Sequence, residues 1–124
     1  MYSFPRTKGK GANRSTGIAI LVKKKLASSM KLVAVDSGKG KVKGKAAAIR
    51  MVSGQLDYDL GGLYFPPVKS MKLQQYNEVC TGIIKWFDRH LAGLPTRSVP
   101  LFAVDLNQDL PNPKDEITDP TVMG

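Results

Sequence analysis

The stretch MKLQQYNEVCTGIIKWFDRHL, residues 71–91, decides the fold class. Its apolar side chains recur at intervals of three and four, which places them on one stripe of an α-helix. The stripe consists of Leu73, Tyr76, Cys80, Ile83, Phe87 and Leu91. Gly93 and Pro95 follow at the point where a helix ends. We expect the stripe to face the core, with Cys80 as a small apolar side chain and Trp86 outside the stripe.

Apolar runs on both sides of this helix predict strands. The predicted strands are residues 17–22, 30–35, 45–52, 55–60 and 99–104. The first is a continuous β-branched run, which is typical of a strand buried on both faces. Ser53-Gly54 lies between two of the runs and predicts a hairpin. The order indicates an α+β fold, with a mixed, mostly antiparallel sheet and one long amphipathic helix.

Residues 56–60 alternate between apolar and acidic side chains, so Asp57 and Asp59 share one face of their strand. Two carboxylates on one face could bind a cation, but an exposed acidic face predicts the same pattern, and we favour that interpretation. Gly61-Gly62 is expected to interrupt or bulge the strand. Pro66-Pro67 ends the segment, because proline cannot donate to a strand ladder.

Composition excludes several classes of protein. The chain has 124 residues, of which 42% are hydrophobic and 23% charged, as in globular domains. Its one cysteine excludes an intramolecular disulfide and a cysteine-rich zinc site. The longest apolar run, residues 18–22, is far shorter than the ~20 residues of a membrane span. Because no signal-peptide pattern is visible, we expect an intracellular location.

Positive charge is concentrated in the first half of the chain. Residues 1–50 contain 13 Lys and Arg and one acid, whereas residues 51–124 contain 6 Lys and Arg and 9 acids. The densest part has four lysines at alternate positions, Lys39, Lys41, Lys43 and Lys45. In an extended chain they would point the same way, about 6.6 Å apart, and could follow a phosphate backbone. A solubilising loop would show the same pattern.

Three side chains stand at predicted strand ends. Asp105 and Asn107 flank Leu106 and so share a face, where a carboxylate could orient a water while a carboxamide binds phosphate. A polar strand end with Asn107 opening a turn is the alternative. The Tyr64 phenol could donate to an anionic oxygen, or it could be a packed aromatic ring. His90 lies near the helix C-terminus, where a cation suits the dipole, and no catalytic triad is visible around it.

In their order and spacing these segments resemble the endonuclease/exonuclease/phosphatase family, the DNase I-like fold, from about residue 16 to 110. The retroelement-type members are the most similar. Residues 17–22 resemble the family's "GxAIL" strand, 44–50 its "GR" strand, 63–67 its "VYxPP" segment, and 102–107 its "GDFN" or "GDLN" motif.

The resemblance implies an αββα sandwich that hydrolyses phosphodiesters or phosphomonoesters with a divalent metal, usually magnesium. It implies that Tyr64 contacts the phosphate, that Asp105 orients or deprotonates the attacking water, and that Asn107 binds the phosphate or supports the aspartate. The family's metal-binding glutamate and catalytic histidine have no counterpart in this sequence. We therefore expect the central part of such a domain, with hydrolase activity incomplete or absent.

The expected organisation is a basic flexible arm over residues 1–15, the partial domain over 16–110 and a polar tail over 111–124. The alternative function is a non-enzymatic nucleic-acid-binding module that acts through its basic first half. A further alternative is a subunit that a second chain completes, because an incomplete sandwich exposes sheet edges. The substrate could be DNA, RNA, a lipid headgroup or a small phosphate ester.

Overall fold

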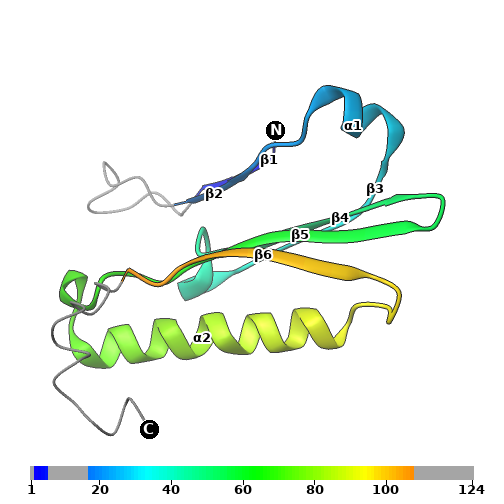
Figure 1. Ribbon diagram of the computed structural model, residues 1–124. Helices are drawn as coiled ribbons and strands as arrows, with labels where there is room; N and C mark the ends of the chain where they lie inside the picture. The colour runs from blue at the N-terminus through cyan, green and yellow to red at the C-terminus, as the bar shows by residue number, and fades with distance from the viewer. Residues whose placement is uncertain (1, 6–16, 108–124) are drawn as a thin grey trace, which may run out of the picture.

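The computed structural model describes residues 2–5 and 17–107, and these form an α+β fold with one long helix (Figure 1). The strands are β1 (Tyr2–Pro5), β2 (Gly17–Ile20), β3 (Lys31–Ser37), β4 (Ala46–Ser53), β5 (Leu56–Tyr64) and β6 (Val99–Asp105). The helices are α1 (Lys24–Ser29), the 3₁₀ turns η1 (Gly40–Val42) and η2 (Val68–Ser70), and α2 (Leu73–Ala92). The expected fold class is confirmed. Within the described ranges no helix is long and apolar enough to span a bilayer.

The main sheet is mixed, with the order β3-β4-β5-β6. The β3–β4 and β4–β5 pairs are antiparallel, whereas β5 and β6 are parallel and are joined through α2. The predicted hairpin is confirmed, since Ser53 pairs with Leu56 across a turn in which Gly54 has a φ of 55°. A parallel pair needs a long crossover, and α2 provides it on one side of the sheet.

The core lies between α2 and the surface of the sheet that it covers, which we call the helix side. Small residues of β4, Ala46 and Ala48, lie opposite Val79, Ile83 and Trp86 of the helix. Because these alanines leave space, the large indole fills it, and Trp86 is only 4% exposed. The expectation that Trp86 lies outside the buried stripe is therefore wrong. Leu73, expected in the stripe, is exposed.

The opposite surface of the sheet, which we call the outer side, is covered in part by β1 and β2 (Figure 1). β2 contacts β5 but pairs only with β1, and its residues alternate between exposed and half-buried. The expectation of a strand buried on both faces is therefore wrong. Residues 2–5, expected in a flexible arm, form β1, and the rest of that arm and the tail lie outside the described residues.

Gly61-Gly62 does not interrupt β5, whose pairing with β4 continues through both glycines without a register shift. Instead, Gly61 makes room for an aromatic ring. A Cβ atom on Gly61 would lie 2.3 Å from Cε2 of Phe102 on the neighbouring β6. Phe102 in turn packs edge-to-face against Phe87, with ring centroids 4.9 Å apart. The missing side chain therefore serves packing between α2 and the sheet rather than a bulge.

Candidate functional site

The parallel pairing of β5 and β6 brings two of the predicted site residues together. Tyr64 is the register partner of Asp105, and both stand at the C-terminal ends of their strands. Because Leu63 packs in the helix-side core, strand alternation directs Tyr64 and its partner Asp105 to the outer side. Tyr64 is half-buried and Asp105 is exposed. A phenol donor and a carboxylate acceptor thus share one strand edge, open to a ligand.

Asn107 closes this edge through hydrogen bonds. Its backbone N–H donates to Oδ1 of Asp105 at 2.9 Å, and its side-chain Nδ2 donates to the carbonyl of Phe65 at 2.7 Å. Asn107 has a φ of 50°, a left-handed conformation that asparagine tolerates well. The Phe65 N–H also donates to the Asp105 carbonyl at 2.8 Å. Of the two expected roles of Asn107, the contacts match support of the aspartate, and the turn interpretation holds as well.

The four alternate lysines do not form the expected extended row. Gly40 to Val42 form η1, and Gly40 and Gly44 have φ values of 59° and 77°. Glycine at positive φ allows this tight turn, so alternate side chains cannot point the same way. Lys39 and Lys43 are exposed, and Lys45 is half-buried. Lys41 forms an ion pair with Glu78 of α2, and this pair lowers the pKa of Glu78.

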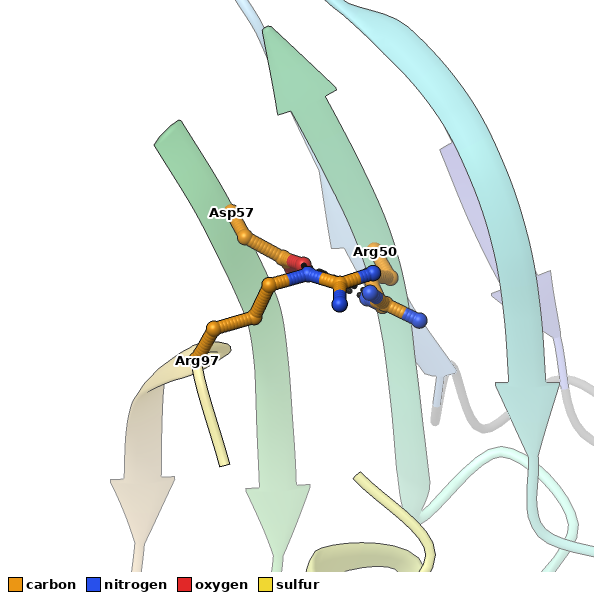
Figure 2. A network of polar contacts seen from close by, with 3 residues as sticks. All are labelled: Arg50, Asp57 and Arg97. Carbon is orange, nitrogen blue, oxygen red and sulfur yellow. Dashed lines mark hydrogen bonds and ion pairs between the residues drawn. The ribbon is translucent and has the colours of Figure 1, made fainter. Parts of the chain in front are cut away.

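Asp57 is buried on the helix side between two arginines (Figure 2). Arg50 Nε donates to Asp57 Oδ1 at 2.8 Å, and Arg50 Nη2 donates to Oδ2 at 2.5 Å. Arg97 Nε adds a third bond to Oδ2 at 3.1 Å. These bonds, with Arg50 as the largest cause, hold the pKa of Asp57 well below its ordinary value and raise that of Arg50. The carboxylate is thus committed to the fold.

His90 joins α2 to two strands. Its Nδ1 lies 2.8 Å from Oδ2 of Asp36 on β3, and its Nε2 lies 2.6 Å from Oδ2 of Asp59 on β5. The imidazole stacks on Trp86 at 4.9 Å and 4°, beside a cavity of about 260 Å³. Since both ring nitrogens face carboxylates, neither is free to act as a general base on a ligand. The arrangement fastens the end of α2 to the sheet.

The interpretation of Asp57 and Asp59 as an exposed acidic face is wrong. The two side chains are 4% and 1% exposed, and they lie under the end of α2. The signal was available in the hairpin. Counting back from the turn places Arg50 directly opposite Asp59 and diagonal to Asp57. The partners from outside the hairpin, His90 and Arg97, could not be counted in this way.

The residues at the Tyr64–Asp105 edge do not make up a magnesium site by themselves. Asp105 is the carboxylate that the described strands place there, and one of its oxygens already accepts from Asn107. Among residues 2–5 and 17–107 no group of three His, Cys, Asp or Glu side chains could hold a metal ion. Asp36 and Asp59 approach opposite nitrogens of His90, so these three do not converge on one point. We therefore derive no step through a metal.

A comparison of the chain with protein-family models, with curated proteins and with solved structures finds no match.

Proposed function

We propose that this chain is a nuclease-like, phosphate-ester-binding domain of DNase I-like architecture, and that its ligand contacts the edge formed by Tyr64 and Asp105. The observation that supports the proposal is the register pairing of Tyr64 with Asp105 at neighbouring strand ends. The sequence segments that resemble the family's tyrosine and aspartate motifs are thus adjacent in space. The layered arrangement of β1–β2, the main sheet and α2 is compatible with part of an αββα sandwich.

Each residue at this edge has a role in the proposal. The Tyr64 hydroxyl donates to a phosphoryl oxygen. The exposed Asp105 carboxylate accepts a hydrogen bond from a water beside the phosphorus, and the Asn107 N–H fixes the orientation of that carboxylate. Magnesium, which the family resemblance implies, would neutralise charge on the phosphoryl oxygens if further ligands held it. Without it, Asp105 repels the phosphate, so binding is weak and turnover stays at background.

Binding of a fluorescent twelve-residue thymidylate oligonucleotide, followed by anisotropy without divalent ions, tests the proposal. Tyr64→Phe should weaken binding about tenfold, because a hydrogen bond to a charged oxygen is lost. Asp105→Asn should strengthen binding about fivefold, because like charges a few Å apart in water repel by about 1 kcal/mol. Affinity that neither substitution changes would overturn the proposal.

Hydrolysis is measured separately with magnesium and supercoiled plasmid DNA. We expect the chain to nick no faster than the Asp105→Asn variant, since the described residues do not hold a metal site. Magnesium-dependent nicking that is lost in Asp105→Asn would show a working hydrolase and would refute the expected background turnover.

A second candidate function, non-enzymatic nucleic-acid binding through the basic surface, is supported by the distribution of charge. Residues 17–107 contain 14 Lys and Arg but only 6 Asp and Glu. Four of those acids are bound to basic side chains of the same chain: Asp36, Asp57, Asp59 and Glu78. The free charge at the surface is therefore mainly positive. This candidate expects affinity that falls steeply with salt and survives Asp105→Asn.

A further inference from the structure

A cavity of about 530 Å³ lies between the end of β3, η1 and the second half of α2. Three cationic side chains from different elements line it: Lys39 precedes η1, and Lys85 and Arg89 stand one turn apart on α2. Ser37 adds a hydroxyl group. The volume is typical of pockets that hold small organic ligands. The lining is rich in donors, so it suits a ligand rich in acceptors.

The charge of this cavity is not neutralised by the fold. Within the part of the chain that the structure describes, Lys39, Lys85 and Arg89 have no ion pair and no side-chain hydrogen bond. The acid in the lining is Asp36, and its Oδ2 is bound to His90. Three cations therefore face one carboxylate that already has a partner, and the local field attracts an anion.

Trp86 provides an independent observation in the same place. It lines the cavity and is 4% exposed, yet its indole Nε1 has no hydrogen-bond partner among the described residues. A buried N–H without a partner costs free energy, and such groups are rare in folded proteins. An oxygen acceptor brought into the cavity would be one way to satisfy it.

We propose that this cavity binds a phosphate group through Lys39, Lys85 and Arg89. Arginine and lysine are the side chains that recognise phosphate oxygens, and a neighbouring serine hydroxyl can add a further donor. The site lies on the helix side of the sheet, so it is separate from the Tyr64–Asp105 edge. It deepens the second candidate function by naming the cations that meet the phosphate. The group can belong to a free nucleotide or to a nucleic-acid backbone.

The free-nucleotide source is tested by titration with adenosine 5′-monophosphate in low salt. Trp86 is the chain's single tryptophan, so its fluorescence reports directly on this cavity. We expect a saturable change with the nucleotide and none with adenosine, which has the same base and sugar but no phosphate. The backbone source is tested with the thymidylate twelve-mer, made without terminal phosphates.

Two charge-matched variants decide whether the cavity is the site. K39Q/K85Q/R89Q should weaken binding of whichever phosphate ligand binds by at least tenfold. K23Q/K24Q/K25Q removes the same charge from the exposed lysines at α1 and should change the affinity less than twofold. Circular dichroism confirms that both variants are folded. Equal loss in the two variants, or binding of neither ligand by the folded chain, would overturn the proposal.

The twelve-mer gives an additional readout. If its backbone phosphates contact the three cations, the slope of log affinity against log salt should fall by about two in K39Q/K85Q/R89Q, at roughly 0.7 per phosphate lost. The control variant should keep the slope of the unmodified chain. An unchanged slope in the cavity variant, together with unchanged affinity, would place nucleic-acid binding elsewhere on the basic surface.

Discussion

Two acidic pairs at the same spacing have opposite surroundings in this molecule. Asp57 and Asp59 on β5 lie buried under α2, where Arg50, Arg97 and His90 meet their carboxylates. Asp105, two positions before Asn107, stands exposed at the end of β6, and its described hydrogen bond comes from a backbone N–H. An alternating polar pattern therefore does not distinguish an acid that folds the chain from one that can meet a ligand. The cations supplied by neighbouring elements make the difference.

The largest expected effect is on stability, from removal of a buried acid. Asp59→Ala leaves the Nε2 of His90 without its acceptor and should cost about 3 kcal/mol in the free energy of unfolding. Asp105→Asn, at an exposed strand end, should change it by less than about 0.5 kcal/mol. Urea unfolding followed by circular dichroism measures both values. Equal losses would remove the distinction between the two acidic groups.

Packing around the buried group gives the next largest effect. Gly61→Ala places a Cβ atom against Phe102 and 2.7 Å from the Ala47 carbonyl, which should cost about 1–3 kcal/mol. Gly62→Ala is the matched control on the outer side. Its nearest neighbour is the end of the Ile18 side chain, 3.3 Å away, so we expect a cost of about 0.5 kcal/mol. Thermal denaturation compares the two, and a greater loss in Gly62→Ala would contradict the packing described here.

The low pKa of Asp57 predicts the direction of a pH effect. Because its folded pKa lies below its ordinary value of 3.8, the unfolded chain binds the proton more readily. The stability due to this carboxylate is fully present above about pH 4 and is lost as the pH falls through the folded pKa. The melting temperature should therefore fall below about pH 4, and less steeply in Asp57→Asn. Identical slopes for the two proteins would show that Asp57 is not held by Arg50.

The smallest expected effect concerns the exposed ion pair of Lys41 with Glu78. Exposed pairs contribute little to stability, since water and salt screen them. Glu78→Gln should leave the melting temperature within the scatter of replicate measurements at physiological salt. A loss as large as that of Asp59→Ala would mean that the pair on η1 is as structural as the buried acids.

Local sequence patterns predicted the elements better than their surroundings. The helix, the hairpin and the strand before Asp105 were each predicted, because periodicity and turn residues act over a few positions. The buried side of α2 was predicted wrongly at Trp86, because its burial depends on small residues in β4 that are distant in sequence. For the same reason the sequence identified Tyr64 and Asp105 but not the lining of the cationic cavity. That cavity is assembled from β3, η1 and α2.

The central claim is that a phosphate ester meets the exposed strand ends rather than the buried acids. Amide NMR spectra of the chain, titrated with thymidylyl-(3′→5′)-thymidine, test it most directly, because this ligand has a single phosphodiester. We predict progressive shifts at Phe65 and at residues 105–107, and their loss in Tyr64→Phe. Spectra in which these amides stay fixed while those of residues 39–45 or 85–89 move would contradict the claim.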